Sequence, residues 1–464
     1  MPETMKAALE RTFRNASDLV VRPVPLECGE VTALFLDGLT SGSEIADFVL
    51  RPLTERVRAD TPQEAFAQAQ AALYGAVLEC VESPETAADR LVRGHCVLLF
   101  PGLSQGLSCE VRTGVKRTPS PPESENTVKG AKDAFVETLR INTSLVRRHL
   151  RTPQLRLENV RVGSRSQTDV TVCYVEGLTD PELAARMKAR LESIRIDGVL
   201  SPAALEETVT GSRRTAFPLL QFTERSDQFC QGLLAGQVGV LADGLPAGYL
   251  APVSLGRLMD SPEDRAVDYI SASFVRVLRY LALFLSLLLP AVYAAMAMYH
   301  QQMIPTKLLL AIIESKRNVP FSTMLEITGL LAAFELLQEA GLHLPQAIGT
   351  AVSIIGGLVV GTAAVDADLV SPAALITAAS AGICGFTLPN RDLSDAVRIW
   401  RFFLTLLAGL AGLFGVTVGF ALLLAHLSGL TSLDAPYLAP FADVRADILR
   451  KRWKTDNRRR EAEP

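Results

Sequence analysis

The sequence predicts an α/β soluble N-terminal region of two similar subdomains, followed by an all-α transmembrane helical bundle. Two observations lead to this fold class: segments before residue 270 repeat one another, and long uncharged runs follow that point. With 464 residues the chain has room for several domains. We expect a first α/β subdomain at 1–118, a connector helix at 119–152, a second α/β subdomain at 153–268, a transmembrane domain at 269–430 and a basic cytoplasmic tail at 431–464.

Two pairs of segments in the N-terminal region have the same pattern. VTALFLDGLTSGSE (Val31–Glu44) matches VTVCYVEGLTDPE (Val170–Glu182), each a β-rich run that ends in an acidic residue, Gly, Leu and Thr before a helix start. LVRGHCVLLFPGL (Leu91–Leu103) matches LLAGQVGVLADGL (Leu233–Leu245), each a helix end, a glycine turn and a strand. The pairs are offset by 139 residues (31 to 170) and 142 residues (91 to 233), so we expect two α/β units of the same plan.

The segment between the repeats, ESENTVKGAKDAFVETLRINTSLVRRHL (Glu123–Leu150), raises the question of a ligand site. One glycine after Lys129 is a weak signal for a phosphate-binding loop. Nucleic-acid binding is also disfavoured, because the net charge of the chain is −4 and the segment has no aromatic set for stacking. Its apolar residues recur at helical spacing, which predicts a connector helix that docks the two α/β units.

Basic residues lie beside the apolar stripe of this predicted helix. They are Arg140, Arg147 and Arg148. We predict that these arginines act in assembly, between the two α/β units and towards neighbouring subunits, rather than in any chemistry.

No motif in the chain indicates an enzyme. The sequence has no G-x-S-x-G, no Walker loop and no H-E-x-x-H. Its five histidines are scattered, and its seven cysteines form neither C-x-x-C nor a Cys/His cluster. Asp37 and Glu176 occupy equivalent turns of the repeats, where a turn-forming role outweighs a catalytic pair. We therefore expect no catalytic residue, no metal, no cofactor and no enzymatic activity.

Four long apolar runs predict membrane spans. Tyr280–Tyr299 is twenty residues without a charge, enough to cross a hydrocarbon core of about 30 Å. The other runs are Ala347–Val365, Leu369–Leu388 and Phe402–Leu427. A soluble core accounts for one such run but hardly for four, so we expect an integral membrane protein in a lipid bilayer. The N-terminus, MPETMKAALERTF, lacks the hydrophobic core of a signal peptide, so we expect the N-terminal region to stay in the cytoplasm.

A further helical segment, MLEITGLLAAFELLQEAGLHL (Met324–Leu344), carries three acids. This segment fits two interpretations equally well: an interfacial helix with one water-exposed face, and a membrane span whose carboxylates line a cation path. Small residues in the next run favour close helix packing and would also suit the wall of a narrow pore. The candidate ion path comprises Glu326, Glu335, Glu339, Ser353, Gly356, Gly357 and Thr362.

Arginines and lysines near the spans leave the topology open. Arg276 and Arg279 precede the first span, and the tail Leu449–Arg460 is basic. Both observations favour cytoplasmic ends and so an even number of spans, four or six. A four-span arrangement would nevertheless place three arginines outside: Arg391, Arg398 and Arg401.

Six segments, in order between Arg117 and Phe441, carry a family resemblance. They are RTPSPPESENTVKGAKDAFVETLRINTSLVRRHL, LRLENVRVGSRSQTDVTVCYVEGL, QMIPTKLLLAIIESKRNVPF, FELLQEAGLHLP, IGTAVSIIGGLVVGTAAVDADLVSP and HLSGLTSLDAPYLAPF. Together they resemble the A subunits of GerA-family spore germination receptors. The chain departs from that family at Lys129, where arginine is usual, at Ala134, in place of glycine, and at Leu331, where members often carry a further acid.

The resemblance implies a membrane subunit in the inner membrane of a dormant spore, with its N-terminal region in the cytoplasm. It implies a homo-oligomer around an ion path, with a transporter-like, nutrient-binding B subunit and a lipoprotein C subunit as partners and no nucleic acid. Nutrient binding would then release monovalent cations and start germination. Two alternatives stay open: a channel subunit like the stage V sporulation AF protein, and a non-conducting receptor scaffold. A secondary transporter ranks last, because the membrane half shows no inverted repeat.

Overall fold

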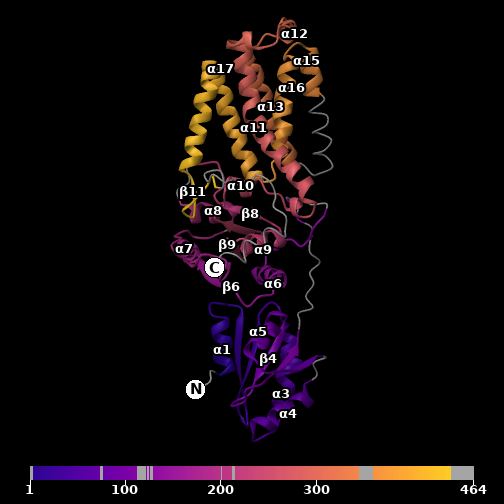
Figure 1. Ribbon diagram of the computed structural model, residues 1–464, viewed down its shortest axis with the longest axis vertical. Coiled ribbons are helices and arrows are strands. Elements are labelled where there is room, and N and C mark those ends of the chain that lie inside the picture. The colour runs from indigo at the N-terminus through magenta and orange to yellow at the C-terminus, as the bar shows by residue number, and fades with distance from the viewer. Residues whose placement is uncertain are drawn as a thin grey trace. The chain divides into compact units, whose positions relative to one another are not determined.

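The computed structural model describes residues 4–73, 77–111, 122, 125, 129–199, 201–211, 215–343 and 359–439. The chain forms two compact units. The α/β unit contains Met1–Arg213 and Leu219–Pro252, and the helical unit contains Arg214–Pro218 and Val253–Pro464. In Figure 1 the α/β unit runs from indigo to magenta, and most of the helical unit runs from rose to yellow.

The first half of the α/β unit is built on an antiparallel five-stranded sheet. In spatial order its strands are β1 (Leu19–Leu26), β2 (Gly29–Leu36), β4 (His95–Leu99), β5 (Gly106–Glu110) and β3 (Leu78–Val81). One face packs against α1 (Met5–Thr12) and α5 (Pro84–Val92). The other packs against η1 (Ile45–Leu50), α3 (Arg51–Arg56) and α4 (Pro62–Ala72), which follow the single turn α2 (Gly42–Glu44).

The central strand β4 shows why this half folds as three layers. All five of its residues are buried. Successive side chains of a strand point to opposite faces, so Cys96 and Leu98 enter one apolar cluster while Val97 and Leu99 enter the other. A strand that is buried on both faces has a continuous apolar sequence. The run Val97–Phe100 (VLLF), which covers the end of β4, is such a sequence.

The second half of the α/β unit repeats the same strand order in another antiparallel sheet. Its strands are β6 (Leu155–Val162), β7 (Thr168–Val175), β9 (Val238–Ala242), β10 (Gly248–Ala251) and β8 (Gln221–Thr223). Helices α6 (Leu139–His149) and α9 (Ser226–Leu234) cover one face. Helix α7 (Pro181–Glu192) packs against β6, β7 and β9, and α8 (Pro202–Thr210) packs against α7.

The predicted duplication is confirmed by these two sheets. The matched sequence segments fall on β2 and β7, and on β4 and β9. The turn that both repeats share has the same backbone in each copy: Gly38 has a φ of 86° and Gly177 a φ of 84°. Glycine enters this left-handed region without the steric cost that a side chain brings, which explains why the acidic-Gly-Leu-Thr pattern occurs in both halves.

The helical unit begins with the short helices α10 (Leu255–Leu258) and η2 (Pro262–Arg265). Its long elements are α11 (Tyr269–Tyr299), α12 (Thr306–Lys316), α13 (Thr323–His343), α16 (Pro372–Phe386) and α17 (Arg391–Gly429). The short elements between and after them are η3 (Gln301–Met303), η4 (Val359–Ala363), α15 (Ala364–Asp366), β11 (Thr431–Ser432) and β12 (Ala435–Pro436). Helix α11 packs against α13, α16 and α17. Buried alanines such as Ala291, Ala378 and Ala408 allow these helices to approach closely.

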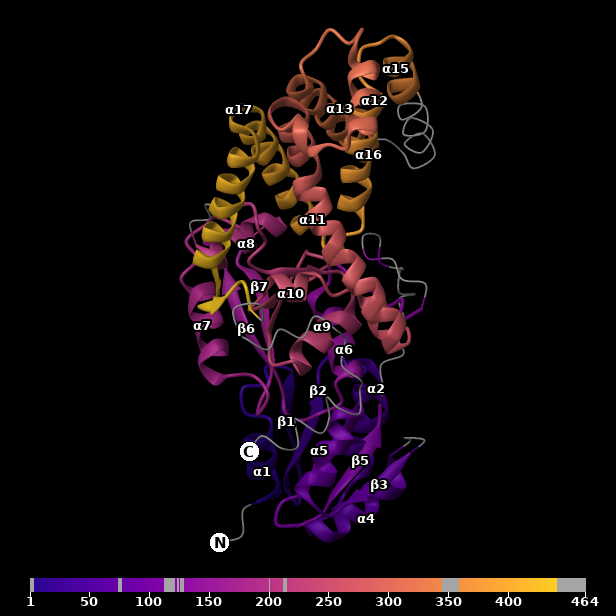
Figure 2. The ribbon, with the colours of Figure 1, turned by 45° about the horizontal axis from the view of Figure 1, so that its top comes forward.

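Helix α17 is not one straight rod. Gly412 interrupts it with a φ of 59° and a ψ of −142°. Figures 1 and 2 show two limbs of α17 that meet at an apex and lie side by side. A Cβ added at Gly419 would lie 2.6 Å from Leu404 Cδ2, which places the second limb against the first. The prediction of one continuous span over Phe402–Leu427 is therefore wrong: this run is a helical hairpin.

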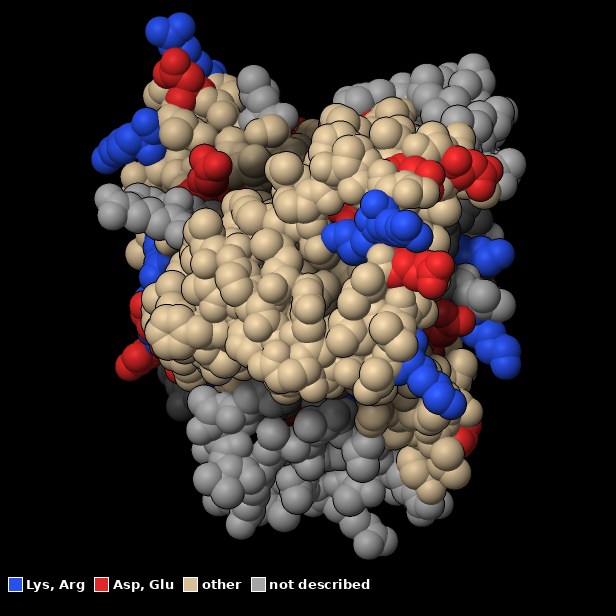
Figure 3. Space-filling model, turned by 90° about the horizontal axis from the view of Figure 1, so that it is seen from above, with Lys and Arg blue, Asp and Glu red and all other residues tan. Residues whose placement is uncertain are grey.

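The surface of the helical unit differs from that of the α/β unit. Among the residues that the structure describes, 32 large apolar side chains are exposed, and 28 of them belong to the helical unit, from Ile270 to Leu424. Figure 3 shows a broad field of uncharged side chains with Lys, Arg, Asp and Glu in small groups around it. By length and composition, α11 is long and apolar enough to cross a membrane, and α17 passes the same test when its two limbs are counted as one helix. These features fit association with a lipid bilayer.

Candidate functional site

The first charged cluster of the helical unit lies between α13 and α17. Glu335, on α13, accepts hydrogen bonds from Arg398 Nη1 and Arg401 Nη2, each at 2.7 Å. Arg401 is 2% exposed and also donates Nη1 to the carbonyl oxygen of Ala381 at 3.3 Å. Arg398 is paired in addition with Asp395, three residues before it. One carboxylate therefore holds two guanidinium groups, an arrangement that is strong where water is scarce.

The second cluster joins the ends of α12, α13 and α16. Glu326, on the first turn of α13, is 2% exposed. One of its oxygens accepts the backbone N–H of Ser371, the N-cap residue of α16, and the other lies 3.1 Å from Lys316 Nζ. Lys316, at the end of α12, also donates to the Thr323 hydroxyl. The buried carboxylate is thus stabilised by an ammonium group and by the positive end of a helix.

The remaining residues of the predicted ion path are more dispersed. Glu339 is exposed on α13, and Thr362 is exposed on η4. Ser353, Gly356 and Gly357 lie outside the described residues. Of the predicted acids, Glu326 and Glu335 are thus held in separate ion pairs.

The cationic partners were not recognised from the sequence. In the sequence Arg398 and Arg401 serve only as topology signals, whereas in the structure both lie on α17, three residues apart and on the side that faces Glu335. A pair of arginines at helical spacing next to an apolar run could have indicated a buried partner. Lys316 offers a weaker signal, because it ends a short helix and pairs with an acid ten residues later.

The arginines predicted for assembly have different environments in the α/β unit. Arg147, on α6, is 1% exposed and donates Nε and Nη2 to the two carboxylate oxygens of Asp18, at 2.7 and 2.8 Å. Arg140 donates to Asp37 at 2.5 Å, and both line an open polar cavity of about 460 Å³. Arg148 is exposed. Helix α6, which packs on the second sheet, is therefore tied by two ion pairs to loops that flank β1 and β2 of the first.

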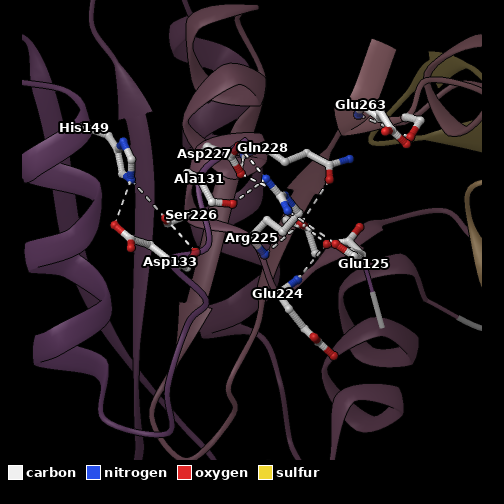
Figure 4. A network of polar contacts seen from close by, with 12 residues as sticks. Glu125, Ala131, Asp133, His149, Glu224, Arg225, Ser226, Asp227, Gln228 and Glu263 are labelled. Carbon is white, nitrogen blue, oxygen red and sulfur yellow. Dashed lines mark hydrogen bonds and ion pairs between the residues drawn. The ribbon is translucent and has the colours of Figure 1, made fainter. Parts of the chain in front are cut away.

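The segment before α6 is fixed by a second polar network, drawn in Figure 4. Arg225, 1% exposed, donates to both carboxylate oxygens of Asp227 and to the carbonyl oxygen of Ala131 at 2.8 Å. Glu125 accepts from the Thr223 hydroxyl at 2.6 Å. Burial raises the pKa of the Glu125 carboxyl to about 7, although this hydrogen bond and one from a backbone N–H lower it. The segment around Lys129 and Gly130 thus leads into contacts with the start of α9.

The described residues hold no group of three or more His, Cys, Asp or Glu side chains that could bind a metal ion. Cys96 and Cys109 face each other across β4 and β5, and burial raises the pKa of both thiols, that of Cys109 to about 11. Thiols of this kind are poor nucleophiles. What the geometry assembles is a set of buried ion pairs between helices and between subdomains.

Fold and ion pairs together define the class: a protein with a duplicated α/β region and an apolar bundle of helices linked by internal charge pairs. The sequence matches the family described as Bacillus/Clostridium GerA spore germination protein over residues 7–462. The chain belongs to the GerA family.

Similar proteins extend over almost the whole chain. An uncharacterized membrane protein, YfkQ of Bacillus subtilis (strain 168), is 35% identical over 96% of this chain and 88% of its own length. Spore germination protein KA of the same organism is 31% identical, over 98% of this chain and 85% of its own length. The crystal structure of the N-terminal domain of the A subunit of the Bacillus megaterium spore germinant receptor GerK3 covers 53% of this chain and 91% of its own, with 25% identity and a TM-score of 0.41.

Proposed function

We propose that the chain is the membrane-embedded A subunit of a nutrient-responsive spore germination receptor, and that several copies enclose a path for monovalent cations. The observation that carries the proposal is the family match, which extends over residues 7–462. The exposed apolar surface of the helical unit supports embedding in a bilayer, because such a surface is unfavourable in water.

The location and the partners belong to the same proposal. We place the protein in the inner membrane of the spore with its N-terminal region in the cytoplasm, beside a nutrient-binding B subunit and a lipoprotein C subunit. The basic tail 431–464 and the arginines before Tyr280 support this orientation. We keep the division 1–118, 119–152, 153–268 and 269–430 as a functional division, in which the connector 119–152 docks the two α/β subdomains.

Glu339 is the acid that we assign to the cation path most directly. Its side chain is exposed on α13, whereas that of Glu326 is buried and that of Glu335 is half-buried. Glu326 is paired with Lys316, and Glu335 is paired with Arg398 and Arg401. The same pairing favours a second candidate function, a non-conducting scaffold in which the charges only hold helices together.

Cation flux separates the two functions. The chain is reconstituted in potassium-loaded liposomes together with its B and C partners, and potassium efflux is followed after addition of nutrient. Glu339→Gln should reduce efflux several-fold without changing assembly, since an exposed carboxylate that attracts cations is lost. The exposed Glu314 of α12 supplies a matched control, Glu314→Gln. Equal efflux from the wild type and Glu339→Gln would favour the scaffold.

A further inference from the structure

We infer that Glu326 forms a binding site for a dehydrated monovalent cation, which the ammonium group of Lys316 occupies in the described structure as a tethered competitor. The inference rests on the proposed cation path and adds to it a site and a means of regulation. It assigns α12 the role of a plug: cation and lysine exclude each other at one carboxylate.

The Glu326 carboxylate requires a cationic partner. Its side chain is 0% exposed, so water cannot stabilise the charge. One oxygen is satisfied by the backbone N–H of Ser371, while the other makes no hydrogen bond in the described part of the chain and lies 3.1 Å from Lys316 Nζ. The contact between this second oxygen and the ammonium group is therefore electrostatic and only loosely directional. A metal cation can take the place of the ammonium group in such a contact.

The lysine is held much less firmly than the acid. Lys316 is 19% exposed on its side chain, at the end of an 11-residue helix. On α12 only Ile312 is buried, while Leu308, Leu310 and Ile313 are all more than half exposed. A helix with one buried residue can move away at low cost, because little apolar contact is lost.

Oxygen atoms would remain around the vacated position. The Thr323 hydroxyl, which accepts from Lys316, lies on the same turn of α13 as Glu326. The Tyr293 hydroxyl of α11 is buried, makes no hydrogen bond to the described part of the chain and lies within electrostatic range of Glu326. One carboxylate and neutral hydroxyl oxygens suit a monovalent cation, since a divalent ion usually requires more than one carboxylate.

The test measures cation-dependent stability of the full chain in detergent, independently of flux. Melting temperatures are compared in potassium chloride, sodium chloride and N-methylglucamine chloride at equal ionic strength. Lys316→Met should melt on the order of 3–6 °C higher in one of the metal salts at about ten times its Kd. The wild type should show no such difference, because its own ammonium fills the site.

Two further variants make the result decisive. Lys307→Met changes an exposed lysine on the same helix and should behave like the wild type. Lys316→Met combined with Glu326→Gln keeps an acceptor for Ser371 but removes the buried charge, so it should fold stably and lose the cation dependence. The inference is overturned if Lys316→Met folds without cation dependence, or if Lys307→Met or the double variant shows the same dependence. If Lys316→Met does not fold in any salt while the double variant folds, no cation replaces the lysine and the inference also fails.

The outcomes separate this site from the proposed function. Cation-dependent stability without potassium efflux from any reconstituted assembly would keep the site and reject the channel. Efflux in the absence of cation-dependent stability would keep the channel and reject Glu326 as a binding site.

Discussion

The ion pair between Asp18 and Arg147 gives a prediction with a definite magnitude. Both side chains are almost buried, at 10% and 1% exposure, and they make two hydrogen bonds of 2.7 and 2.8 Å. Arg147→Met removes the guanidinium and leaves the carboxylate unpaired. Loss of one partner from such a buried pair costs about 3–5 kcal/mol.

This cost should be visible in amide hydrogen exchange of the intact chain. Some amides of α6 and β6 exchange when the contact between Asp18 and Arg147 opens. In Arg147→Met these amides should exchange roughly 100-fold faster or more. Arg148→Met is the matched control, because Arg148 is exposed on the same helix and should change exchange little. Asp18→Asn combined with Arg147→Met should recover part of the protection. Unchanged exchange in Arg147→Met, or an equal increase in Arg148→Met, would refute the reasoning.

Three further predictions concern other charges and the bend of α17. Glu335→Gln leaves the buried Arg401 without its carboxylate and should lower the melting temperature of the chain in detergent by about 6 °C or more; no change would contradict the pairing. The pKa of Glu125 in the folded chain, about 7, lies above its ordinary value of 4.5, so the folded state binds more protons between these values. Protection of the Glu224 amide from exchange, corrected for intrinsic rates, should therefore fall as the pH rises from 5 to about 7, and less so in Glu125→Gln. The bend at Gly412 makes α17 a helical hairpin, so in the proposed membrane arrangement Arg391→Cys and Ser428→Cys should be labelled from the same side; labelling from opposite sides would contradict the hairpin.

The duplicated α/β region could be predicted because its signal is repeated. The Asp37-Gly38 and Glu176-Gly177 turns follow strands in equivalent positions, and their glycines have the same positive φ. A pattern that occurs twice at nearly equal offsets requires no knowledge of tertiary contacts. The apolar run of α11 was equally clear, since length and lack of charge identify it without a partner.

The bend of α17 and the ion pairs depend on distant contacts. Gly412 lies in a run with Gly409, Gly415 and Gly419, and glycine is common in membrane helices, so composition does not show which of them turns the chain. Glu335 meets arginines 63 and 66 residues later in the chain. From the sequence alone, the charges of these arginines indicate only membrane topology. A single sequence does not show that α13 and α17 bring them into contact with one carboxylate.

The measurement that tests the central claim most directly is nutrient-dependent potassium efflux from liposomes that contain the whole receptor. Assemblies with and without this chain are compared, at equal amounts of the B and C partners. We predict efflux only when this chain is present, with a rate that rises on addition of nutrient. Equal efflux without the chain, or no efflux from a folded and complete assembly, would contradict the assignment of the cation path to this subunit.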